Sequence, residues 1–134
     1  MSGRFNIVAG FGFLAAFMLY GFVLIYLRDF APGKAQWIAD YAVGKHFESR
    51  LAHAHGNLFA LINIAVGLVL LRLKPSTSRN WISGLALAGM LMPLGILSEV
   101  LFGVPPLLVM AGGAAMVLAM GWLALAALRL DTAA

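Results

Sequence analysis

The stretch LAHAHGNLFALINIAVGLVLL, residues 51–71, decides the fold, because about 20 consecutive apolar residues form a helix long enough to cross a membrane. The same stretch contains two histidines, His53 and His55, and two asparagines, Asn57 and Asn63. Ionisable and amide side chains are costly at membrane depth, so those found there commonly serve a function. The sequence therefore places the candidate functional site in this segment.

The composition is typical of an integral membrane protein. Of the 134 residues, 63% are apolar and 10% are charged, whereas soluble domains contain about 45–50% apolar and about 25% charged residues. The histidine-containing helix is predicted over residues 51–73, and three further stretches of spanning length cover residues 7–27, 81–102 and 105–128. We therefore predict an all-α integral membrane protein, a bundle of four transmembrane helices forming a single domain over residues 1–134.

The connections between these helices differ in length and in charge. Residues 28–50 form the only long connection and contain seven of the fourteen charged residues. Within it, residues 35–47 carry aromatic and apolar side chains at helical spacing, which predicts an amphipathic helix at the membrane interface. Arg72, Lys74 and Arg79 flank the short second loop, whereas the third loop has no charge. This distribution favours cytoplasmic termini in a multi-pass protein of the cytoplasmic (inner) membrane.

The composition also excludes several kinds of site. The chain has no cysteine, which excludes disulfides, cysteine zinc sites and iron–sulfur clusters. The net charge of +4 is explained by loop charges that orient the helices, so we predict no nucleic-acid partner. The expected partners are the lipid bilayer and a small apolar substrate.

A helical projection places the two histidines on different faces, because positions two residues apart point about 200° apart on a helix. His53 and His55 therefore cannot bind one metal ion from an unbroken helix. The face of His53 is small and polar and has Asn63 at its edge. Its other members are Gly56, Asn57, Ala60, Ile64 and Gly67.

We expect this face to point into the bundle or towards a flat ligand, since Gly56 and Ala60 would let a planar macrocycle approach the backbone. A neutral imidazole is a common proximal ligand of haem. His53 is the preferred metal ligand, with Asn57 or Asn63 able to donate a hydrogen bond to a molecule bound above it. Two alternatives stay open: His55 is the ligand at a subunit interface, or both histidines lie at the membrane surface and bind nothing.

Three further polar residues are candidates for the same pocket. Ser98 and Glu99 lie near the end of the third apolar stretch, where Glu99 either reaches the interface or acts as a proton donor or acceptor. Tyr20 lies deep in the first stretch, and its hydroxyl needs a hydrogen-bond partner. Pro93 interrupts the hydrogen-bond ladder of the third helix, and such kinks often widen a cavity.

The order of these features resembles the styrene oxide isomerase family, small four-helix membrane enzymes. An apolar first helix is followed by a long loop with the turn Pro32-Gly33, by Arg50 just before Ala52-His53, and by the run Ile64-Ala65-Val66. The motifs cover the first half of the chain, and the second half agrees in helix number and length. The resemblance implies haem b held by His53 between the protomers of a trimer. Ferric iron would then act as a Lewis acid that opens an epoxide and rearranges it to a carbonyl compound.

The sequence departs from the family's pattern at two pocket positions. Phe59 stands where the family has an asparagine, and the third helix contains no tyrosine. The resemblance therefore supports haem ligation in this chain more strongly than it supports the isomerase reaction. The alternatives are a small proton-coupled transporter around Glu99, a haem-binding or electron-transfer subunit without chemistry of its own, and a structural membrane protein.

Overall fold

The computed structural model describes residues 3–128, and all the regular secondary structure of these residues is helical. The helices of this part, in chain order, are α1 (Gly3–Asp29), α2 (Lys34–Ala39), α3 (Gly44–Leu70), α4 (Thr77–Gly89), α5 (Leu91–Phe102) and α6 (Leu107–Ala127). Helices α1, α3 and α6, and α4 together with α5, are long and apolar enough to cross a membrane. The prediction of an all-α chain with four helices of spanning length is confirmed.

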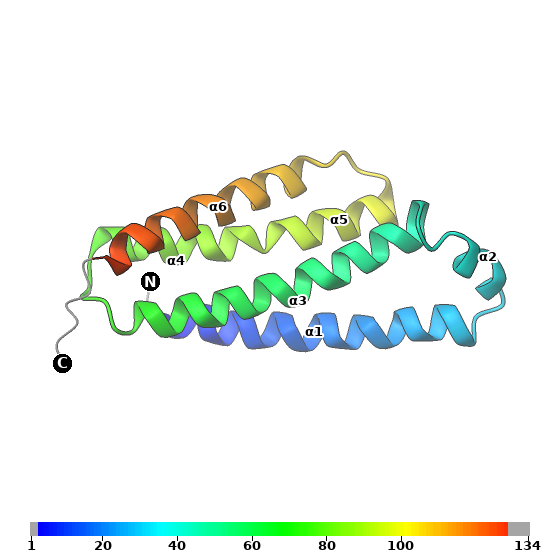
Figure 1. Cartoon of the computed structure of the whole chain (residues 1–134), viewed down its shortest axis with the longest axis horizontal. Coiled ribbons are helices and arrows are strands. Elements are labelled where there is room, and N and C mark those ends of the chain that lie inside the picture. The colour runs from blue at the N-terminus through cyan, green and yellow to red at the C-terminus, as the bar shows by residue number, and fades with distance from the viewer. Residues whose placement is uncertain (1–2, 129–134) are drawn as a thin grey trace.

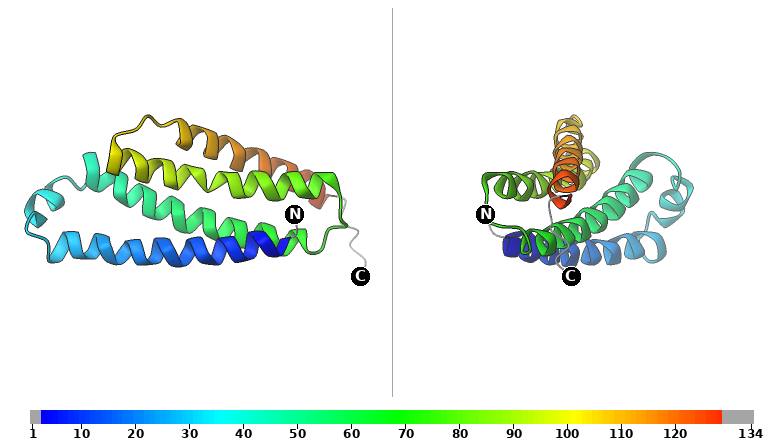
Figure 2. Two further views of the ribbon diagram at one scale, coloured as in Figure 1. Left: turned by 180° about the vertical axis from the view of Figure 1, so that it is seen from behind. Right: turned by 60° about the vertical axis from the view of Figure 1, so that its left-hand side comes forward.

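The four spanning segments lie side by side. Figure 1 shows α1, α3, the pair α4–α5 and α6 in that order across the molecule, and the reverse view in Figure 2 preserves it. The main contacts follow this order, since α3 packs on α1 and on α4–α5, and α6 packs on α4–α5. Helix α3 therefore has α1 on one side and the pair α4–α5 on the other.

The third spanning segment is divided into α4 and α5 at Met90. Pro93 has no backbone N–H to donate to the carbonyl of Gly89, and its ring would clash with that carbonyl in a regular helix. Helix α4 accordingly ends at Gly89, and α5 starts at Leu91. The interruption expected from Pro93 is therefore present, one turn before the proline itself.

The interfacial segment is shorter than the helix predicted over residues 35–47. Helix α2 ends at Ala39, and α3 already begins at Gly44, whose φ of +58° lies in the left-handed region that favours glycine. His46, in the first turn of α3, is buried, stacks on Trp37 and donates a hydrogen bond from Nδ1 to the Trp37 carbonyl. This contact holds α2 against the start of α3.

The close contact between α1 and α3 depends on small residues. A methyl group on Gly10 would lie 2.8 Å from the carbonyl oxygen of Ala60, and one on Gly67 would lie 2.5 Å from that of Gly3. Glycine lets membrane helices approach until their backbones touch, which maximises van der Waals contact. The face of α3 that carries the small residues thus points into the bundle, against α1.

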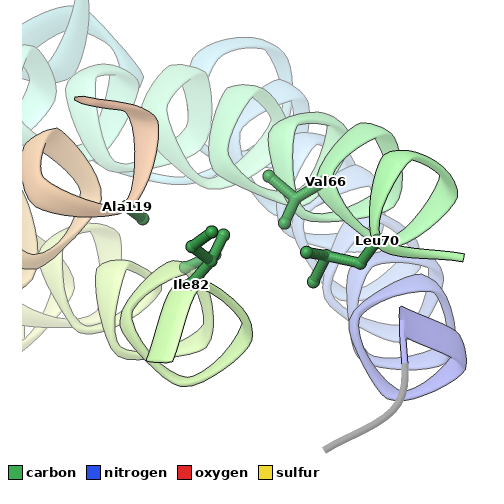
Figure 3. Close-up of a cluster of buried hydrophobic side chains, with 5 residues drawn as sticks. Val66, Leu70, Ile82 and Ala119 are labelled. Atoms are coloured by element: carbon green, nitrogen blue, oxygen red, sulfur yellow. The ribbon is translucent and has the colours of Figure 1, made fainter. Parts of the chain in front are cut away.

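The other side of α3 packs into an apolar cluster formed with α4 and α6. Figure 3 shows Val66 and Leu70 of α3 opposite Ile82 of α4, with Ala119 of α6 beside them. All four are essentially inaccessible. At this end of the bundle, neighbouring helices therefore cover both sides of α3.

Candidate functional site

His53 lies between α3 and α1, where its imidazole is already engaged. The amide nitrogen Nδ2 of Asn57, one turn further along α3, donates a hydrogen bond to Nε2 of His53 over 3.1 Å. Helix α1 comes close at this point because residue 21 is glycine, and a methyl group there would lie 2.8 Å from the same Nε2. The lone pair of Nε2 therefore has a partner, and the space in front of it is closed by α1.

Tyr20 completes a polar group around His53, which we call the His53 cluster (Tyr20, His53 and Asn57). The Tyr20 ring lies with its centroid 6.4 Å from that of the imidazole, tilted by 48°. Oδ1 of Asn57 is buried and has no hydrogen-bond partner within the described residues. The structure thus brings together three of the predicted site residues and leaves one acceptor of the cluster unsatisfied.

His55 differs from His53 in the state of its two ring nitrogens. Nδ1 lies 2.9 Å from the carbonyl oxygen of Leu51, and because a carbonyl only accepts hydrogen bonds, Nδ1 carries the proton. Nε2 is then the basic nitrogen, and no residue in the range 3–128 hydrogen-bonds to it. The ring is partly exposed, with Phe59 edge-on at 6.1 Å. This tautomer, fixed by a backbone carbonyl, is typical of imidazoles that bind a metal through Nε2.

Gly56 and Ala60, predicted to lie under a flat cofactor, are buried against α1. A methyl group on Gly56 would meet the ring of Phe17, and Ala60 is fully buried beside Gly10. Their small size serves the packing of α3 against α1.

Asn63 belongs to a separate polar network in which α1, α3 and α4 meet. Asn6 donates from Nδ2 to Oδ1 of Asn63 at 3.0 Å and to the Ser83 carbonyl at 3.1 Å, while Ser83 Oγ donates to Asn6 Oδ1. Asn63 in turn donates to the carbonyls of Phe59 at 3.1 Å and Ala86 at 2.8 Å. All three side chains are completely buried, and every amide group in the network has a partner.

This network lies away from the histidines, since Asn63 is ten residues, or about 15 Å of helix, beyond His53. Sequence reasoning missed its other two members, Asn6 and Ser83. The available signal was an amide and a hydroxyl in otherwise apolar helices, although only the packing of the three helices shows that they meet.

Ser98 and Glu99 are also separate from the histidines. Ser98 donates its hydroxyl to the Gly95 carbonyl of its own helix at 2.7 Å. Oε1 of Glu99 is buried and lacks a hydrogen-bond partner among residues 3–128. No hydrogen bond in this part of the chain connects either side chain to His53 or His55.

Side chains that could bind a metal ion are dispersed in the described part of the chain. Across residues 3–128, no three His, Cys, Asp or Glu side chains come together to bind an ion. A haem needs only one axial side chain from the protein. No family model, curated protein or solved structure matches the chain.

Proposed function

We propose that this chain is a membrane haem-b protein in which Nε2 of His55 would hold the haem iron. The observation that carries the proposal is the hydrogen bond from His55 Nδ1 to the Leu51 carbonyl, which leaves Nε2 basic and without a partner. His53, which the family resemblance implies as the ligand, fits less well. An imidazole nitrogen binds a metal at about 2 Å, and Nε2 of His53 faces both Asn57 and the backbone of α1.

The surroundings of His55 suit a large apolar cofactor at the outside of the protomer. The ring is partly exposed, and Leu58, on the next turn of the same face, is 51% exposed. A macrocycle on this side would be covered by lipid or by a second copy of the chain, in keeping with the homotrimer that the resemblance implies. Phe59 and the Leu51 carbonyl restrict the rotation of the imidazole.

The reaction that we propose is the rearrangement of an apolar epoxide to a carbonyl compound. When bound, a ferric haem supplies a Lewis acid for opening the epoxide. The chain's own contribution is to orient the imidazole and to offer a water-poor surface, reached from the lipid, on which an apolar substrate concentrates. The His53 cluster, with its unsatisfied Asn57 Oδ1, is the nearest polar group on the same helix.

The test is the absorption spectrum of the detergent-purified protein between 350 and 700 nm, after supplementation with haem. We expect a stoichiometric Soret band in the wild type and in His53→Ala, and its loss in His55→Ala. His53→Ala is the matched control, since it removes an imidazole from the same helix. A colourless wild-type protein contradicts the haem proposal, and loss of the band only in His53→Ala contradicts the choice of ligand.

One observation favours a second candidate, a small proton-coupled transporter. A buried carboxyl oxygen without a partner, as in Glu99, is a place where a proton binds and is released. This candidate predicts that an apolar cation releases protons from the wild-type protein in weakly buffered detergent solution. Glu99→Gln abolishes the release if the carboxyl is the proton site, and equal release from both proteins excludes it.

A further inference from the structure

A cavity of about 590 Å³ lies between the α3–α4 turn, the start of α4 and the last turns of α6. Figure 1 shows that α4 begins and α6 ends at the same end of the bundle. Its polar part comes from the α3–α4 turn and the first residues of α4. The side chains that line this part are Arg72, Lys74, Ser76, Ser78 and Arg79. The cavity therefore concentrates three cations and two hydroxyl groups at one end of the membrane-spanning helices.

The positive charge of the cavity is not balanced within the described residues. No carboxylate of residues 3–128 lines the cavity or forms an ion pair with its three cations. Arg79 donates from Nη1 to the Leu73 carbonyl at 3.1 Å, but its Nε is buried and has no partner in this part of the chain. A buried guanidinium N–H without an acceptor calls for an oxygen-bearing ligand.

The start of α4 adds to the preference for an anion. Ser76 caps the helix by accepting a hydrogen bond from the Arg79 backbone N–H at 3.2 Å. The remaining amides of the first turn and the positive end of the helix dipole favour a negatively charged group at this position. Arg79, the hydroxyls and the helix terminus thus all select for a phosphate or a similar oxyanion.

The other wall of the cavity is apolar and open. Trp122 and Leu125 of α6 line it and are 38% and 63% exposed. An inorganic ion would leave this surface unused, whereas a lipid would place its acyl chains there. Tryptophan is also enriched at the depth of lipid headgroups.

We propose that this cavity binds the phosphate of an anionic glycerophospholipid through Arg72, Lys74 and Arg79, with the acyl chains against Trp122 and Leu125. Basic pockets at the ends of transmembrane helices commonly hold anionic headgroups. The proposal agrees with cytoplasmic termini, because the cavity lies at the end of the bundle where α1 begins, and the cytoplasmic leaflet is rich in anionic lipid.

The experiment is native mass spectrometry of the full chain in detergent, titrated with phosphatidylglycerol or phosphatidylcholine. We expect one phosphatidylglycerol to bind at least tenfold more tightly than phosphatidylcholine. The double variant Arg72→Gln/Lys74→Gln should weaken phosphatidylglycerol binding roughly 30-fold, since each basic side chain near a headgroup contributes about a factor of five. Neither side chain makes a described internal hydrogen bond, so the fold should persist.

Arg4→Gln is the matched control, because Arg4 is an exposed arginine at the same end of the bundle but outside the cavity. It should bind phosphatidylglycerol as the wild type does. Equal binding of the two lipids, or equal loss in Arg4→Gln and in the double variant, overturns the proposal. Displacement of phosphatidylglycerol by inorganic phosphate at equimolar concentration also overturns it, because the site would then be specific for the free ion.

Discussion

The polar side chains in the middle of α3 and those nearer its end differ in whether their hydrogen-bonding groups have partners. Near the end of the helix, Asn63 is completely buried and every hydrogen-bonding group of its network is satisfied. In the middle of the helix, His55 Nε2 and Asn57 Oδ1 have no described partner. Asn57 Oδ1 is buried although buried polar groups in a low-dielectric medium are normally paired, whereas His55 Nε2 belongs to a partly exposed ring that a ligand can reach. We therefore regard the Asn63 network as structural and the His55 region of the same helix as the proposed functional site.

The largest effect should come from filling the contact between α1 and α3. Gly10→Leu should destabilise the fold by about 3 kcal/mol, because the side chain would collide with the Ala60 carbonyl and Ile64. Gly12→Leu is the control on the same helix, since a Cβ at Gly12 meets open space. Equilibrium unfolding in mixed detergent micelles measures both. Equal destabilisation by the two substitutions would show that α1 does not pack on α3 through Gly10.

A smaller effect should follow from breaking the amide network. Asn63→Ala should destabilise the protein by about 2 kcal/mol, because it leaves Asn6 Nδ2 and the Ala86 carbonyl buried with fewer partners. The same unfolding measurement applies. A change below about 0.5 kcal/mol would mean that the network contributes no net stability, as many polar contacts between membrane helices do.

The smallest effect should come from the other asparagine of the same helix. Asn57→Leu should change the free energy of unfolding by about 0.5 kcal/mol or less, because removing a buried oxygen that has no partner offsets the loss of the hydrogen bond from Asn57 Nδ2 to His53 Nε2. Asn63→Leu should destabilise the protein at least as much as Asn63→Ala. Measuring Asn57→Leu and Asn63→Leu together compares the same substitution at two positions of α3. Similar losses at both positions would remove the distinction drawn between them.

The helical fold was predictable because apolar length and proline chemistry act locally. The spanning segments follow from hydropathy, and the break at Met90 follows from Pro93 three residues later. The bounds of α2 and α3 were less predictable. Glycine adopts positive and negative φ with similar ease, so the sequence does not show that Gly44 has a φ of +58° and starts α3.

The candidate site was predictable only in part, because its geometry depends on other helices. The helical projection correctly separated the faces of His53 and His55. It did not show that Gly21 of α1 closes the space in front of His53, which changes the preferred ligand. In the same way, the sequence indicates only that Arg72 and Arg79 are loop charges that orient the helices in the membrane. The approach of α6 forms the cavity around them.

The most direct test of the account is the ring ¹⁵N NMR spectrum of the chain's three histidines before and after addition of zinc protoporphyrin, a diamagnetic substitute for haem. We expect His55 to carry its proton on Nδ1, and we expect only its Nε2 resonance to shift strongly on binding. Assignment comes from His53→Ala and His55→Ala. A shift confined to His53, or no shift at any histidine, would contradict the proposal that the free nitrogen of His55 marks the functional site.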